Sequence, residues 1–173
     1  PEDLAKIPRL QRQDLDPKIR RIPLDKTTVA GAPVWYHDLF TNGIAYLDIG
    51  FDLRTVPQDL LPYLSLFGRS LFEIGTETED FVRLSQRIGS RTGGMWAHSM
   101  VTPQRTSREA VARFQVRGRA MMNQIPDLID ILRDVLLTVN LDNRDRFLQM
   151  VLEEKAGEEA GLIPGGHSVV GLR

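Results

Sequence analysis

The sequence predicts an α+β domain in which one antiparallel sheet is covered by helices. Strand-like segments come in consecutive pairs, and so do segments with helical spacing, in the order strand-strand-helix-helix, which then occurs again. Paired strands favour hairpins and an antiparallel sheet, whereas single strands alternating with single helices would favour a parallel one. The 173 residues, 42% apolar and 26% charged, are enough for one sizeable core.

The first segment, residues 1–23, is polar and interrupted by prolines, with no period of 2 or 3.6. We therefore expect an extended linker arm over 1–23 and a single α+β domain over 24–173. The chain starts with Pro and stops just as an apolar pattern begins. We expect a segment cut from a longer polypeptide, with a domain truncated at its C-terminus.

The first strand pair is predicted at residues 34–40 and 44–53, which flank Asn42 and Gly43. Both turn residues tolerate positive φ, so this pattern indicates a β-hairpin. Alternation along the second strand puts one set of side chains on the core face. These are Ala45, Leu47, Ile49, Phe51 and Leu53.

The first helix pair follows. Residues 59–75 carry apolar side chains near helical spacing and end in glycine, which indicates a mostly buried helix. Thr76 and Glu79 have the spacing of a capping box, so a second, amphipathic helix is expected from there to Gly93-Gly94.

A second strand pair is predicted at residues 95–102 and 109–120, followed by helices over 123–139 and from an Asp142 N-cap to Pro164. The strand 109–120 has the clearest alternation in the chain. One face carries Ala110, Ala112, Phe114, Val116, Gly118 and Ala120, and the other carries Val111, Arg113, Gln115, Arg117 and Arg119.

Composition excludes several classes of function. A net charge of -1 gives no overall attraction to nucleic acid or to an anionic membrane, so we expect neither as a partner. No stretch approaches the length of an apolar membrane span. The absence of cysteine excludes disulfides and thiolate metal sites, and favours a soluble protein of a reducing compartment such as the cytoplasm.

Catalytic and metal-ligating patterns are missing from the sequence. Its histidines, His37, His98 and His167, are far apart and belong to no HxxEH or HExxH motif, so solvated or hydrogen-bonded imidazoles are expected. No serine lies in a GxSxG elbow, and no glycine pair lies in a phosphate-binding loop. We therefore expect no catalytic residue and no metal ligand in this chain.

Five arginines cluster around one predicted strand, and such a basic face can bind RNA phosphates. They are Arg105, Arg108, Arg113, Arg117 and Arg119. The interleaved aromatic residues of a base-stacking platform are missing from that strand's face, and acidic residues elsewhere cancel the charge. A solvated or inter-domain face is the favoured interpretation.

Several stretches together resemble one family, the pitrilysin/insulinase-type zinc metallopeptidases of the presequence protease branch. The order and spacing of these stretches match that branch over nearly the whole chain. They are IPRLQRQDLDPKIRRIPL, DLFTNGIAYLDIGFDL, LLPYLSLFGRSLFEIGT, RTGGMWAHSM and IPGGHSVVGLR.

The resemblance implies four homologous α+β units in two halves that enclose a peptide-cutting chamber, with an HxxEH zinc motif in the first unit. This chain looks like the start of the non-catalytic C-terminal half. The implied roles are structural: Gly93 and Gly94 for a backbone turn, Gly166 and His167 for a helix start.

The resemblance implies a non-catalytic domain of a peptidase that degrades short unstructured peptides, forming part of the chamber wall and of the contact between halves. Its partners would be the remaining domains of its own polypeptide and peptide substrates, with zinc bound elsewhere in the full-length protein. The alternative is a free-standing interaction or scaffold module of the same fold.

Overall fold

The computed structural model describes residues 10–19, 21–105 and 107–171, which fall into two compact units that meet in sequence between Thr41 and Asn42. The first unit contains a short 3-10 turn, η2 (Arg12–Asp14), and the strands β1 (Asp25–Val29) and β2 (Ala32–Tyr36). These two strands form an antiparallel pair. Residues 1–9 of the expected linker arm lie outside the described residues, and the expected boundary at residue 23 falls within the first unit.

The hairpin predicted around Asn42 and Gly43 is wrong. Both residues have positive φ, 55° and 78°, as the turn chemistry requires. However, β2 pairs with the strand before it, through a turn at Ala30 and Gly31, whose φ values are 50° and 82°. A turn sequence fixes the local backbone but not which strand becomes the partner, and an alanine with positive φ gives no recognisable signal.

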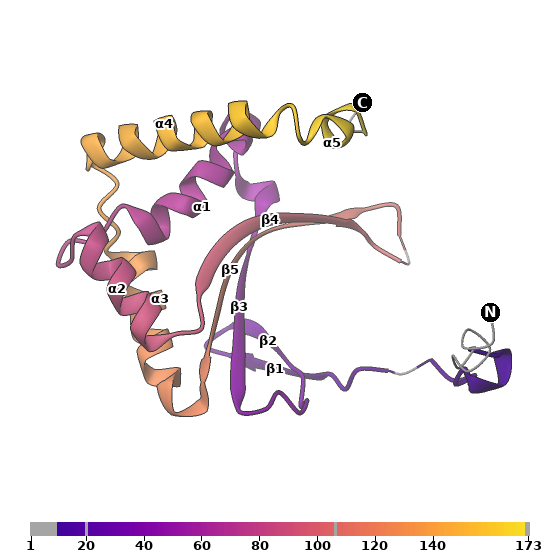
Figure 1. The fold of residues 1–173 in the computed structure, drawn as a ribbon. Helices are drawn as coiled ribbons and strands as arrows, with labels where there is room; N and C mark the ends of the chain where they lie inside the picture. The colour runs from indigo at the N-terminus through magenta and orange to yellow at the C-terminus, as the bar shows by residue number, and fades with distance from the viewer. Residues whose placement is uncertain (1–9, 20, 106, 172–173) are drawn as a thin grey trace, which may run out of the picture. The chain divides into compact units, whose positions relative to one another are not determined.

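The second unit is built on a three-stranded antiparallel sheet in the described residues, with the order β3-β5-β4. The central strand is β5 (Ala110–Met121), and the outer strands are β3 (Ile44–Asp52) and β4 (Met95–Pro103). Figure 1 shows the helices on one side of this sheet. The helices are α1 (Leu64–Glu73), α2 (Phe81–Arg91), α3 (Ile125–Leu137), α4 (Arg144–Gly161) and α5 (Gly166–Gly171), with 3-10 turns η3 (Leu53–Thr55), η4 (Gln58–Tyr63) and η5 (Met122–Gln124).

This architecture confirms the predicted α+β class. The core lies between the sheet and the helices α1, α2 and α3, since burying one sheet face against helices removes apolar surface from water. On β5, the face predicted to be buried is buried, with Phe114, Val116 and Ala120 almost inaccessible. The other buried core residues are Leu53, Leu71, Phe72, Leu84, Leu128, Ile131, Leu132 and Val135.

Two glycines let helices approach the sheet closely. A Cβ at Gly68 of α1 would lie 3.1 Å from the Ala97 Cβ of β4, and a Cβ at Gly118 of β5 would lie 2.6 Å from Cδ1 of Leu128 on α3. Side chains at these positions would push the helices off the sheet, so the glycines set the packing distance.

Helix boundaries depart from the predictions at three places. The segment predicted as one helix from residue 59 begins as η4, and α1 starts only at Leu64, after Pro62. The first turn of α2 is capped by Asp80, whose carboxylate accepts a hydrogen bond from the Arg83 N–H, and not by Thr76. At α4, the cap is Asn143 in place of the predicted Asp142.

Candidate functional surfaces

One face of the sheet points away from the core helices, and we call it the open sheet face. The strand register brings together on it side chains from three strands that are distant in the sequence. Tyr46 lies opposite Arg119, and Arg117 lies between Asp48 and Trp96. The open sheet face consists of Tyr46, Asp48, Asp52, Trp96, His98, Met100, Arg113, Gln115, Arg117 and Arg119.

Acidic residues of β3 neutralise two of the arginines of β5. The Nε of Arg117 donates to Asp48 at 2.7 Å, and Arg113 forms an ion pair with Asp52 at 2.8 Å. Asp52 also accepts from Arg54 at 2.9 Å. Hydrogen bonds from Arg54, then from Arg113, hold the pKa of the Asp52 carboxyl far below its usual range. The acidic residues of β3 therefore cancel most of the charge that suggested a nucleic-acid surface.

Arg119 differs from these two arginines. Its Nε donates to the backbone carbonyl of Gly93 at 2.6 Å, and among the described residues no carboxylate pairs with it. Its guanidinium lies 5.9 Å from the ring centroid of Trp96, which also has Arg117 at 5.8 Å. Arg119 is therefore the uncompensated cation of the open sheet face.

The sequence interpretation missed the aromatic residues of this face. Strand 109–120 does carry no aromatic side chain between its arginines, but Trp96 of β4 and Tyr46 of β3 lie on either side of β5. Both are exposed, Tyr46 by 58% and Trp96 by 40%. Only the strand register reveals this arrangement, and a single-strand pattern carries no signal for it.

The structure places the three histidines in separate surroundings. His37 lies in the first unit, with its Nδ1 2.6 Å from the Pro23 carbonyl oxygen. His98 lies on the open sheet face, and its Nδ1 is shielded from solvent without a hydrogen-bond partner among the described residues. His167 is exposed on α5. In the described part of the chain, no three His, Asp or Glu residues gather as metal ligands would.

The four residues expected to be structural lie at two ends of elements. Gly94 precedes β4 with a φ of +112°, a left-handed conformation that suits glycine. Gly93 is held to β5 by its N–H, which donates to the Arg119 carbonyl at 2.7 Å, and a Cβ there would lie 3.0 Å from the Arg119 side chain. Gly166 is the first residue of α5, and His167 follows it.

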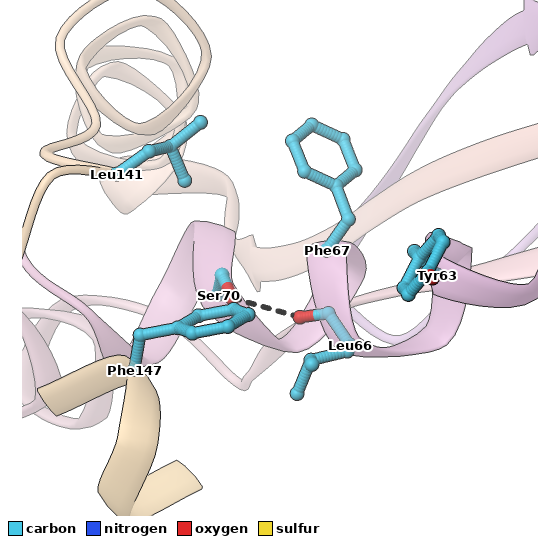
Figure 2. Close-up of a pocket in the computed structure, with 6 residues that line it drawn as sticks. All are labelled: Tyr63, Leu66, Phe67, Ser70, Leu141 and Phe147. Carbon is cyan, nitrogen blue, oxygen red and sulfur yellow. Dashed lines mark hydrogen bonds between the residues drawn. The ribbon is translucent and has the colours of Figure 1, made fainter. Parts of the chain in front are cut away.

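A second surface is the groove between α1 and α4, which we call the α1–α4 groove. Its apolar end is a hollow of about 300 Å³. Figure 2 shows the side chains that surround this hollow, with the Ser70 hydroxyl bonded to the Leu66 carbonyl oxygen in its floor. The lining residues are Tyr63, Leu66, Phe67, Ser70, Leu141 and Phe147.

Helix α4 is held to α1 mainly by charged groups. Arg69 of α1 donates to Glu153 at 2.6 Å and to the Met150 carbonyl at 3.2 Å. The carboxylates of Glu73 and then Glu153 raise the pKa of the Arg69 guanidinium further. Arg146 of α4 reaches back to the Glu73 carbonyl oxygen at 2.9 Å.

The apolar residues of α4, in contrast, are largely unpacked. Met150 is the buried residue of this helix. Leu148 and Leu152 are 58% and 57% exposed, and Phe147 at the groove is half-buried. An 18-residue helix with so little buried surface gains little from its own unit. None of the described helices combines the length and the apolar character of a membrane-spanning segment.

Comparison with known proteins gives a consistent result over the whole chain. The family described as associated with peptidase family M16, subfamily C, matches residues 1–173. Presequence protease 1, chloroplastic/mitochondrial, of Arabidopsis thaliana is 34% identical over 173 residues, covering 100% of this chain and 16% of the plant protein. Protein HypA of Clostridium perfringens is 29% identical over 169 residues, covering 97% of this chain and 17% of that protein.

A vertebrate protein shows the same relationship. Presequence protease, mitochondrial, of Danio rerio is 23% identical over 167 residues, which cover 96% of this chain and 16% of that protein. The chain thus spans less than a fifth of the length of these relatives, and in each of them the matching segment is part of a larger polypeptide. The chain belongs to the family of domains associated with the subfamily C peptidases of family M16, in the presequence protease branch, as its sequence motifs indicated.

Proposed function

We propose that this chain is a non-catalytic domain of a zinc peptidase that degrades short unstructured peptides. In this proposal the domain forms part of the chamber wall and of the contact between the two halves of the enzyme. The remaining domains of the same polypeptide are its partners. Zinc and its HxxEH motif lie in another part of that polypeptide, because these 173 residues contain no such motif.

The observation that carries the proposal is the exposed apolar surface of α4 and the α1–α4 groove. Fully burying a leucine side chain gains about 1.5–3 kcal/mol, so Leu148 and Leu152 represent unused stabilisation. A surface patch of this kind marks a contact with another protein surface. The relatives contain the same segment inside a chain about six times longer, which supports a partner within the same polypeptide.

Compartment is a separate part of the proposal. The absence of cysteine suits a reducing compartment such as the cytoplasm. Among the relatives, the plant protein is named as chloroplastic/mitochondrial and the Danio rerio protein as mitochondrial, whereas the Clostridium perfringens protein comes from a bacterium.

The test compares one substitution in two contexts. In the 173-residue chain, Leu152→Glu should change stability by no more than about 0.5 kcal/mol, because the side chain is already in solvent. In the parent polypeptide, the same change should lower the melting temperature and the rate of hydrolysis of a fluorogenic peptide. Glu159→Gln, on the same helix, is the control and should be silent in both.

The outcome that contradicts the proposal is equally specific. If Leu152→Glu is silent in the parent polypeptide as well, the α4 surface faces solvent there. The domain would then make its contacts elsewhere, or none.

A further inference from the structure

The strongest unexplained feature of the molecule is the arrangement around Arg119 on the open sheet face. We propose that Arg119, between Tyr46 and Trp96, binds the C-terminal carboxylate of a free peptide. The inference rests on the proposed function, since it names the part of the peptide that this wall of the chamber would hold.

The first argument is charge. Of the three arginines that β5 presents on this face, Arg113 and Arg117 are neutralised by Asp52 and Asp48. Arg119 pairs with no carboxylate among the described residues, and its single side-chain hydrogen bond goes from Nε to the Gly93 carbonyl. The contacts of the described residues leave both terminal nitrogens of its guanidinium available. Such a fork matches the two oxygens of a carboxylate.

The second argument is that this guanidinium is held in place. The Nε bond to Gly93 at 2.6 Å fixes the plane of the group, and Trp96 lies 5.9 Å from it. A cation held before binding loses less side-chain entropy when it accepts a ligand. The arrangement therefore favours recognition of a ligand over a freely moving surface arginine.

The third argument concerns the neighbouring aromatic rings. Trp96 and Tyr46 are both exposed beside Arg119, on the strands that flank β5. Exposed aromatic side chains next to a fixed polar group supply apolar contact area for the side chain adjoining a bound carboxylate. A terminal carboxylate is the one anionic group that every unmodified peptide has, which suits an enzyme that degrades peptides of many sequences.

The experiment uses the 173-residue chain with Trp35→Phe, so that tryptophan emission reports Trp96 alone. The probes are N-acetyl-Ala-Leu-Phe with a free carboxylate, the same peptide as its C-terminal amide, and N-acetyl-Ala-Glu-Phe-amide. We expect the free acid to bind at least about tenfold more tightly than either amide, as for a charge-assisted hydrogen bond. Arg119→Gln should remove this preference, whereas Arg133→Gln, an exposed arginine of α3, should leave it intact.

Equal affinity of the acid and the plain amide would overturn the proposal, and this comparison needs no variant to fold. Equal affinity of the acid and the glutamate-containing amide would overturn the assignment to the C-terminus. Equal loss with Arg119→Gln and Arg133→Gln would show only a general charge effect and would also overturn it. Binding to this chain is measured without hydrolysis, so its failure is distinct from a failure of the proposed function, which is read from the parent polypeptide.

Discussion

Gly75 and Glu79 are packed backbone against backbone: a Cβ at Gly75 would lie 2.8 Å from the Glu79 carbonyl oxygen. That oxygen accepts a hydrogen bond from the Thr76 N–H at 2.8 Å, and the Thr76 hydroxyl accepts one from the Glu79 N–H at 3.1 Å. The Gly75 carbonyl in turn accepts from Asn140, beyond the end of α3. This closed turn fixes how α1, α2 and α3 meet, and its geometry requires glycine at residue 75, where φ is +100°.

Replacing Gly75 by alanine should therefore destabilise the chain by about 2–3 kcal/mol, from the positive φ and from the clash with a backbone atom that cannot move aside. Gly89 is the matched control, because it lies inside α2 and a Cβ there meets nothing within 4 Å. Gly89→Ala should raise stability by about 0.5–1 kcal/mol through the better helix propensity of alanine. Urea unfolding measures both, and two changes of the same sign would contradict this description of the turn.

Neighbouring residues of β5 should respond very differently to truncation. Phe114 is 5% exposed and its ring lies 5.7 Å from that of Phe67, so Phe114→Ala should cost about 3–5 kcal/mol. Gln115 points to the open sheet face, and Gln115→Ala should change stability by no more than about 0.5 kcal/mol. Similar unfolding free energies for the two variants would show that the faces of the strand are assigned the wrong way round.

The faces of β5 were predictable because alternation is a local property of the strand. Pairing is not local, and it decided the hairpin that was predicted wrongly. Asn42 and Gly43 have the conformation expected of a turn, yet Ile44, which follows them, pairs with Met121 far along the chain. Local turn chemistry competes with the burial of a whole strand face, and burial against β5 prevails.

Similar reasoning explains the errors on the helices. Thr76 and Glu79 do bond to each other, but as a turn before the helix, since a capping-box spacing also fits a closed turn. On α3, Ile129 was placed in the inward-facing series and is 50% exposed, whereas Ile131 and Val135 are buried. Helical spacing in an apolar segment fits more than one face, and only the position of the sheet selects between them.

The candidate surfaces could not be predicted for the same reason. Arg119, Trp96 and Tyr46 come from three different strands and meet only through the register of the sheet. The α1–α4 groove depends on where α4 lies on α1, which is set by contacts such as that of Arg69 with Glu153. Sequence motifs identified the family but not these positions.

Arg146 should be the most sensitive charged residue of α4. Its side chain is 10% exposed, it donates to the Glu73 carbonyl at 2.9 Å, and its guanidinium lies 4.4 Å from the Phe81 ring centroid. Arg146→Ala removes the hydrogen bond and the cation–π contact together, and should cost about 2–4 kcal/mol. Arg144→Ala, at an exposed position on the same helix, should have little effect. Hydrogen exchange should show α4 losing protection before the sheet in the Arg146 variant, and unchanged protection would contradict its role in holding α4.

Asp52 should make the stability of the chain depend on pH in acid. Its pKa is depressed in the folded state by Arg54 and Arg113, so its contribution is fully present above its ordinary pKa of 3.8. As pH falls below that value, the unfolded chain takes up the proton first, and this contribution is progressively lost. Asp52→Asn should be less stable than the wild type at pH 7, with a difference that shrinks at pH 3 and in high salt. Urea midpoints at both pH values measure this, and a difference independent of pH would exclude the ionised carboxylate as its origin.

The 173-residue chain by itself should neither bind zinc tightly nor cleave peptides. A catalytic zinc site needs about three well-placed nitrogen or oxygen ligands and an open position for water. The histidines of this chain are scattered, it has no cysteine, and the described residues contain no group of three or more possible ligands. Metal analysis of the dialysed chain should therefore find well under one zinc per molecule, and a fluorogenic peptide should remain uncut. The parent polypeptide, assayed in parallel, should contain zinc and cut the same peptide. Stoichiometric zinc in the isolated chain, or turnover abolished by a chelator and by His98→Ala, would make this domain an enzyme in its own right.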